Sequence, residues 1–213
     1  MYVFSRHARL ALGQTRAARM WATEITDRIN QVTGLQVALY AQVMSAETDA
    51  LDWGVMVPDL ATLETAMDKL AVDDFFIAEQ DRAAGFLAGL PTDSLQTVIH
   101  GSMDADAAAP EYTTTITTVC RPGCLERGIT VGIELAQRVE ELSGAASIMT
   151  MHETGQYGTL SWFTGHPGIE SVEATSSALA ADPGWVRFVD ERVAENYTDV
   201  PWASMQTMHR RIA

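Results

Sequence analysis

The sequence predicts an α+β protein made of two tandem ferredoxin-like units, each a βαββαβ repeat. Three observations predict this class. The chain matches itself at an offset of 110 residues, with one slip to 109 and one return. Both halves show the same order of extended and helical patterns. In both, a glycine follows the long first helical pattern, at Gly34 and at Gly144. A self-match at a fixed spacing has to be read first, because it decides the fold.

The self-match is collinear over nearly the whole chain. At an offset of 110 it begins with Tyr2 and Tyr112, Gly13 and Gly123, and Gly34 and Gly144. At 109 it pairs Trp53 with Trp162, Phe76 with Trp185, and Asp81 with Asp190. It returns to 110 and ends on the pentapeptides SLQTV (94–98) and SMQTM (204–208). We interpret the match as a tandem duplication, with a first repeat at 1–101, a polar linker at 102–111 and a second repeat at 112–213.

Each element of the first half has a sequence signal. Residues 2–12 are extended, and residues 14–33 carry one apolar helical stripe, formed by Ala18, Trp21, Ile25, Ile29 and Val32. Residues 35–43 and 50–57 predict a hairpin. A helical region follows over about 59–87, broken near Asp73, and a last strand starts near Ser94. Glu24 with Arg28, and Glu134 with Arg138, are spaced as helix-surface ion pairs. This element order is the split β-α-β arrangement.

A ferredoxin-like unit covers one face of its sheet with helices and leaves the other face bare. Two units in one chain therefore predict that the bare faces pack against each other as an intramolecular pseudo-dimer, with further homo-oligomerisation left open. The opening strand of the first copy is more polar and basic, with Ser5, Arg6, His7 and Arg9, where the second has TTTITT. Any pocket is therefore expected to be asymmetric, with more ionisable groups from the first copy.

The charge balance excludes two classes of partner. The net charge is −14, and both halves are acidic: residues 1–101 hold 13 acidic and 7 basic residues, and residues 102–213 hold 15 and 7. Nucleic-acid binding needs a basic surface, and so does attraction to anionic lipid. No apolar run is long enough for a membrane span, and the N-terminus lacks a signal pattern, so we expect no membrane insertion and a cytoplasmic location.

The residues also carry a family resemblance. The features are the helix ends TG (33–34) and SG (143–144), Trp53 and Trp162 on the third strands, and the segments KLAVDDFF (69–76) and ALAADPGW (178–185). In these features the whole chain resembles a tandem-fused form of the dimeric α+β barrel superfamily, of the antibiotic-biosynthesis-monooxygenase and NIPSNAP-like kind. The resemblance implies an intramolecular pseudo-dimeric α+β barrel with ligands between the sheets. It fixes fold and not reaction.

The sequence predicts no metal and no cofactor. Haem-degrading members of this superfamily use an asparagine on the first strand, a tryptophan and a histidine on the second helix. Here the asparagines are Asn30 and Asn196, and residues 59–90 and 168–199 contain no histidine. Cys120 and Cys124 have no further cysteine or histidine at metal-ligand spacing, so two ordinary thiols are expected. The other interpretation is a reactive Cys124 at the start of a helix.

Two functions remain open on the sequence. The first is a non-catalytic module that binds a hydrophobic small molecule or serves assembly. The alternative is a cofactor-independent monooxygenase-like enzyme, with its substrate held between the sheets and His7 or His152 as the proton-transferring group. The sequence does not distinguish an enzyme from a binding module, and it identifies neither the ligand nor the partner. The expected ligand-binding residues are Trp53, Trp162, Tyr40, His7, Met149 and Met151.

Overall fold

The structure of the chain, a computed structural model, describes residues 1–47, 49–102, 108–198 and 205–213. The described chain forms two compact units, Met1–Leu95 with Arg210–Ala213, and Gln96–His209. The middle of the expected linker, residues 103–107, lies outside the described residues. The repeat boundaries at 101 and 112 remain a prediction, because they follow the self-match of the sequence, whereas the compact units follow packing.

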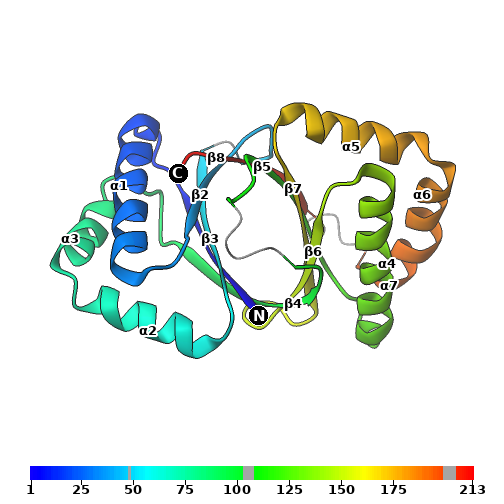
Figure 1. The fold of residues 1–213 in the computed structure, drawn as a ribbon, viewed down its shortest axis with the longest axis horizontal. Coiled ribbons are helices and arrows are strands. Elements are labelled where there is room, and N and C mark those ends of the chain that lie inside the picture. The colour runs from blue at the N-terminus through cyan, green and yellow to red at the C-terminus, as the bar shows by residue number, and fades with distance from the viewer. Residues whose placement is uncertain (48, 103–107, 199–204) are drawn as a thin grey trace. The chain divides into compact units, whose positions relative to one another are not determined.

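The first unit contains one set of the expected elements. They are β1 (Tyr2–Arg9), α1 (Thr15–Thr33), β2 (Ala38–Gln42), β3 (Ala50–Val57), α2 (Leu60–Ala71), α3 (Asp74–Ala83) and the start of β4 (Thr92–His100). The three helices lie on one face of these strands (Figure 1). The long helical region predicted over 59–87 is therefore two helices, separated beside Asp73 as expected.

The second unit repeats this order. Its elements are β5 (Tyr112–Val119), α4 (Leu125–Ser143), β6 (Ser147–His152), β7 (Thr159–His166), α5 (Ile169–Ala181), α6 (Pro183–Phe188), η1 (Val189–Val193), α7 (Ala194–Asn196) and β8 (Met205–Arg211). The helices of this unit also lie on one face of its strands (Figure 1). No helix in the described ranges is long and apolar enough to cross a bilayer.

The strands are hydrogen-bonded in the order β1-β3-β2-β8-β5-β7-β6-β4, which closes on itself as a barrel. Within the first unit, β1 and β2 both pair antiparallel with β3, and Arg6 lies opposite Trp53. Within the second, β5 and β6 both pair antiparallel with β7, and Ile116 lies opposite Trp162. The predicted α+β class, with two ferredoxin-like βαββαβ sets in a pseudo-dimeric barrel, is confirmed.

Both long helices end as the sequence predicts. Gly34 has φ 78° and Gly144 has φ 71°, a left-handed conformation that glycine adopts without steric cost. Their N–H groups donate to the carbonyls of Asn30 and Glu140, one turn back. At the start of α3, Asp73 accepts from the N–H of Phe76, which satisfies a free donor of the first turn.

In the first unit the apolar face of β3 lies against the helices, and a charged side chain lies on its opposite face. Along β3, Leu51, Trp53, Val55 and Val57 are buried, and Leu51 and Trp53 pack in a core with Trp21 and Ile25 of α1. The alternate position, Asp52, bonds to His7 of β1 instead. The face that the helices leave bare is therefore charged at this part of the sheet. The alternation of a strand sends every second side chain to the other face.

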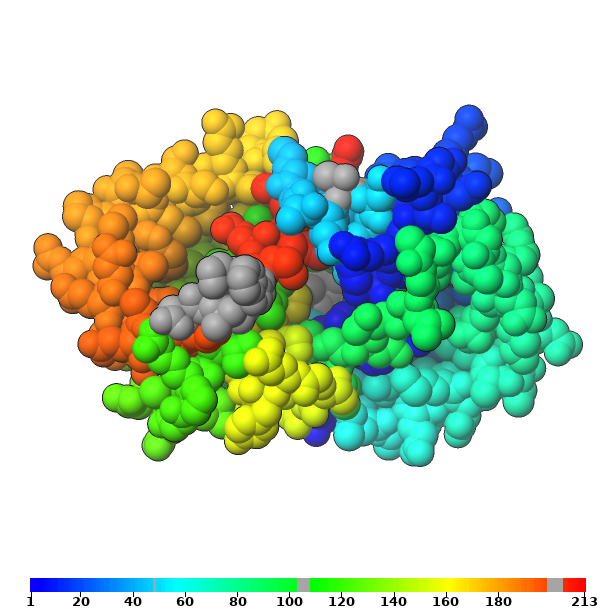
Figure 2. All heavy atoms as spheres, turned by 180° about the vertical axis from the view of Figure 1, so that it is seen from behind, coloured from blue at the N-terminus to red at the C-terminus, as the bar shows by residue number. Residues whose placement is uncertain are grey.

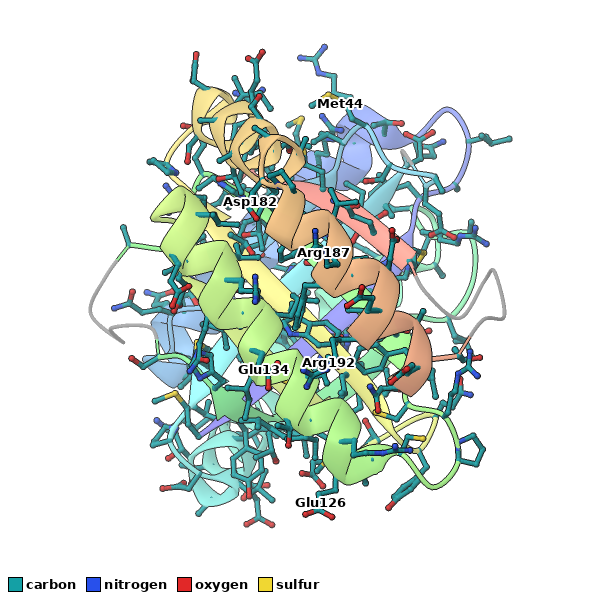
Figure 3. The ribbon with its side chains drawn as sticks, turned by 90° about the vertical axis from the view of Figure 1, so that its right-hand side faces the viewer. Met44, Glu126, Glu134, Asp182, Arg187 and Arg192 are labelled. Carbon is teal, nitrogen blue, oxygen red and sulfur yellow. The ribbon has the colours of Figure 1, made fainter. Side chains whose placement is uncertain are left out.

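The expected helix-surface ion pairs are replaced by contacts between helices. Arg28 donates to Asp73, the residue that caps α3, through Nε at 3.1 Å. Arg138 lies over the ring of Phe188, with 4.7 Å from Cζ to the ring centroid. Glu134 of α4 pairs with Arg192 of η1 at 3.4 Å (Figure 3). The charges thus join the first helix of each unit to its second helical layer.

Candidate functional site

The first unit contains a cavity of about 890 Å³, partly open to solvent, between the helix-facing side of its sheet and helices α1, α2 and α3. This volume falls in the range of small-molecule sites, about 300–1,000 Å³. In Figure 2, α2 and α3 (cyan to green) form the outer surface of this unit. Most of the residues that line the cavity are apolar, and Trp21, Trp53, Phe4 and Phe76 supply aromatic rings.

Strand alternation decides which side chains reach this cavity. On β1 these are Phe4, Arg6 and Ala8, each two residues apart, and on β3 they are Trp53 and Val55. The intervening residues point to the other face. His7 and Trp53 therefore lie on opposite faces of the sheet, and the single site with both that the sequence suggested does not form.

Hydrogen bonds fix the two tryptophan rings of the cavity. The Nε1 of Trp53 donates to Oγ1 of Thr26 at 2.9 Å, and that of Trp21 donates to the carbonyl of Glu79 at 3.1 Å. The two indoles meet edge to face, with centroids 6.1 Å apart. Such edge-to-face pairs are favourable beyond the area they bury. The aromatic wall is therefore rigid and tied to both α1 and α3.

The segment after α3 closes one side of the cavity through Leu87, Gly89, Leu90 and Pro91. Two backbone bonds hold it to the end of β1: the N–H of Ala11 donates to Phe86, and the N–H of Ala88 donates to Arg9. Leu90 is 96% exposed although it lines the cavity. An apolar side chain in this position belongs to the mouth of a site that opens to solvent.

Arg6 supplies the formal charge in the cavity wall. Its Nε and Nη2 donate to the two carboxylate oxygens of Asp93, at 2.7 and 2.8 Å. The hydrogen bonds that Arg6 donates to Asp93 raise the pKa of Arg6 further, although burial opposes this. The other polar residues described in the wall are Thr33 and Gln80. The cavity therefore offers hydrogen bonding at few points on an apolar surface.

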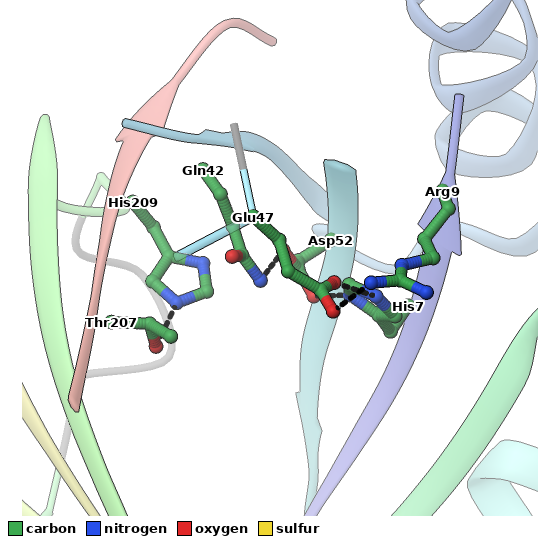
Figure 4. A network of polar contacts seen from close by, with 7 residues as sticks. All are labelled: His7, Arg9, Gln42, Glu47, Asp52, Thr207 and His209. Carbon is green, nitrogen blue, oxygen red and sulfur yellow. Dashed lines mark hydrogen bonds and ion pairs between the residues drawn. The ribbon is translucent and has the colours of Figure 1, made fainter. Parts of the chain in front are cut away.

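His7 lies on the other face, in a network of charged groups (Figure 4). Its Nδ1 is 2.8 Å from Oδ1 of Asp52, and its Nε2 is 3.3 Å from Oε2 of Glu47. A carboxylate only accepts hydrogen bonds, so both ring nitrogens carry a proton when both contacts are made. The hydrogen bond between His7 Nδ1 and the carboxylate of Asp52 is the main cause that raises the pKa of His7. The two carboxylates thus favour the protonated, imidazolium form of His7.

The same network includes two further side chains of the first unit. Gln42 donates to Oδ2 of Asp52 at 3.2 Å, and Arg9 pairs with Glu47. Tyr40 lies on β2 between Leu39 and Ala41, which pack into the helix-facing core, so Tyr40 belongs to the polar face with His7. Tyr40 is half-buried. Of the ligand-binding residues expected in the first unit, His7 and Tyr40 therefore share one face of the sheet, and Trp53 lies on the other.

His152 lies in a corresponding network of the second unit. Its Nε2 is 2.9 Å from Oγ of Ser161, and this hydroxyl is 2.8 Å from Oγ1 of Thr117. Burial lowers the pKa of His152, because the environment disfavours the charged ring. Ser161 is 1% exposed, so it offers no accessible nucleophile.

The remaining sequence candidates belong to the second unit's helix-facing core. Trp162 is 3% exposed and its Nε1 donates to the carbonyl of Gly132 at 2.9 Å. Met149 is fully buried in the same core, and Met151 packs against it. These three residues therefore lie between the sheet and α4, on the face away from the one that carries His152.

The cysteines show no sign of a metal centre. No cluster of histidine, cysteine and acidic residues suited to a metal occurs in the part of the chain that the structure describes. Burial raises the pKa of Cys120 to about 11, which makes its thiolate scarce at neutral pH. The half-buried Cys124 precedes α4 and its sulfur accepts from Arg127.

The comparisons with known proteins bear on the fold. No protein-family profile and no curated protein matches the chain. A candidate monooxygenase from Fusobacterium nucleatum matches with a TM-score of 0.72, at 6% identity, over 100% of this chain and 92% of its own. An anthrone oxidase-like protein matches with 0.69, at 10% identity, over 100% and 91%. A candidate monooxygenase from Lactobacillus acidophilus matches with 0.66, at 7% identity, over 99% and 93%.

The chain has the dimeric α+β barrel fold. Identities this low show the fold alone, and the reaction has to be argued from the site.

The sequence pointed to Trp53, but it did not predict the cavity around this residue or the place of Arg6 in the cavity wall. The signal was present: Leu51, Trp53 and Val55 alternate with Asp52 and Gly54, which places Trp53 on the face that the helices bury.

Proposed function

We propose that the protein binds an apolar small molecule in the cavity of its first unit, without chemical conversion. The observation that carries the proposal is the cavity itself, about 890 Å³ with a rigid aromatic wall. Burial of apolar ligand surface supplies about 25 cal/mol per Å², enough for useful affinity in a cavity of this size. The sequence also suggested a role in assembly, but no contact among the described residues supports that role.

The polar groups favour binding over catalysis. The described polar residues of the wall are Arg6, Thr33 and Gln80, and none of these titrates near neutral pH. His7, the sequence candidate for proton transfer, lies on the other face and both of its ring nitrogens contact carboxylates. A general base needs a free lone pair within reach of the substrate.

The second candidate function is a cofactor-independent, monooxygenase-like reaction on a ligand in the same cavity. The names of the structural neighbours favour it, since two are candidate monooxygenases and one is anthrone oxidase-like. Two measurements distinguish turnover from binding. Ligand-dependent oxygen consumption, together with a product whose mass is higher by that of oxygen, would show that the protein is an enzyme.

The test of binding uses two substitutions on one helix. Ala83 of α3 lines the cavity, and Ala78 of the same helix is exposed and outside it. Ala83→Phe places a ring in the cavity, and Ala78→Phe adds the same ring to the surface. A fluorescent naphthyl ketone should bind the wild type and Ala78→Phe with similar Kd, and Ala83→Phe should weaken it at least about tenfold.

Thermal unfolding of each variant shows whether the fold is intact, so that a loss of binding reports on the cavity. Native mass spectrometry of gently purified protein provides an independent reading, because a resident ligand should be lost from Ala83→Phe alone. Equal affinity in all three proteins would contradict the proposal.

A further inference from the structure

The ion pair in the cavity wall carries information about the charge of the ligand. Arg6 stands opposite Trp53 in the strand register, and both line the cavity. Asp93 of β4 binds the guanidinium through two parallel hydrogen bonds, at 2.7 and 2.8 Å. This fork-to-fork geometry is the strongest form of an arginine–carboxylate contact.

The bonds to Asp93 leave part of the guanidinium available. They use Nε and Nη2, and no described residue bonds to Nη1. Among the described residues of the wall, Arg6 alone carries a formal charge, and Asp93 already balances it. The wall therefore presents hydrogen-bond donors with no net charge.

We propose that the cavity selects uncharged ligands that carry a hydrogen-bond acceptor for Arg6, and that Asp93 sets this selection. The inference rests on the proposed binding function and names the ligand class for it. A carbonyl, ester or ether oxygen can accept from Nη1 while the ion pair stays intact. The apolar remainder of the ligand then fills the aromatic part of the cavity.

A ligand carboxylate is disfavoured for a physical reason. To bond Arg6 with the same geometry it has to displace Asp93, or else it lies close to a like charge. The protein as a whole carries a charge of −14, which adds to the repulsion at low salt. The side chains of Arg6 and Asp93 are 37% and 44% exposed, so a displaced Asp93 is rehydrated. We therefore expect selection of about tenfold rather than complete exclusion.

The experiment compares two probes of nearly equal size, a dimethylamino-naphthyl ketone and the corresponding naphthoate. In the wild type the ketone should bind about tenfold more tightly than the naphthoate. Asp93→Asn keeps the side-chain shape and removes the charge, so Arg6 becomes free to pair with an anion. That variant should bind the naphthoate at least about tenfold better than the wild type does, and the preference should reverse.

Arg6→Gln is the matched control, because it should weaken the ketone several-fold and give no gain for the naphthoate. If both probes bind and Ala83→Phe blocks them, but Asp93→Asn leaves their ratio unchanged, the charge selection is wrong and the binding function stands. A wild type that prefers the naphthoate overturns the selection as well. If Ala83→Phe affects neither probe, the binding function fails first.

Discussion

The two units differ most in the space beside their equivalent tryptophans. In the first unit Trp53 lines the cavity together with Leu87. In the second unit the equivalent of Leu87 is Tyr197, which is 3% exposed and lies edge to face with Trp162 at 5.7 Å. The equivalence is also structural, since Leu87 forms an isolated antiparallel β-bridge with Leu10, and Tyr197 forms one with Cys120. The ring of Tyr197 thus fills the space beside Trp162 that stays open beside Trp53, where the smaller Leu87 stands.

Small residues on α4 make room for this filling. A Cβ at Gly128 would lie 2.6 Å from Sγ of Cys120, and one at Gly132 would lie 2.7 Å from Cζ2 of Trp162. The equivalent positions of α1 are Ala18 and Ala22, both fully buried. The second unit therefore combines bulky core side chains with glycines, whereas the first combines alanines with a cavity. The first unit therefore keeps open space where the second unit is filled by side chains.

The largest expected effect tests this contrast directly with Trp162→Ala and Trp53→Ala. Both substitutions remove an indole and one indole hydrogen bond. Trp162 is packed on all sides, so its loss should lower the free energy of unfolding by about 3–5 kcal/mol. Trp53 already lacks some neighbouring atoms at the cavity, so its loss should cost about 1–2 kcal/mol less. Denaturation in urea measures both, and equal losses would mean that the cavity does not distinguish the units.

The prediction with the next largest effect tests the role of the α4 glycines. Gly132→Ala improves intrinsic helix propensity by about 1 kcal/mol, yet its Cβ has no room beside Met149 and Trp162. We expect a net loss of about 1–3 kcal/mol, as in overpacked cores. Thr130→Ala, on the exposed side of the same helix, is the control and should change stability by less than about 0.5 kcal/mol. A more stable Gly132→Ala would show that α4 can move away from the sheet at little cost.

The fold was predictable because each half repeats local signals that agree with one another. Gly34 and Gly144 end their helices in the left-handed conformation that their position in the pattern requires. The second slip in the self-match also has a structural counterpart. It falls between Asp190 and Pro201, where the second half has one residue more, and Val189–Val193 is a π-helical turn. One inserted residue in a helix is accommodated by such a turn.

The site was less predictable because both faces of a strand can be buried in this architecture. Trp53 and His7 are single residues with strong chemical character, and both were assigned to one site. Their separation depends on the register of β1 against β3, in which Arg6 and not His7 lies opposite Trp53. The sequence does not fix that register. The bond between Arg6 and Asp93, 87 residues apart, depends on the pairing of strands in the same way.

The smallest expected effect compares the polar faces, where His7, Asp52 and Gln42 stand at the positions of Thr117, Ser161 and His152. The charged network raises the pKa of His7, whereas burial lowers that of His152. A raised folded pKa contributes stability that is present below the unfolded value, about 6.5, and is lost as the pH rises through the folded value. A lowered folded pKa contributes stability that is present above about 6.5 and is lost as the pH falls through the folded value.

The two histidines should therefore give stability differences of opposite pH dependence. The difference in unfolding free energy between the wild type and His7→Gln should be largest below a pH of about 6.5. It should shrink as the pH rises, and the total change should be about 1 kcal/mol or less. For His152→Gln the difference should be largest above that pH and shrink as the pH falls. Urea denaturation of both variants over this range measures the slopes. A His7 difference that grows with pH would mean that the ring is neutral in the native state, and it would reopen His7 as a base.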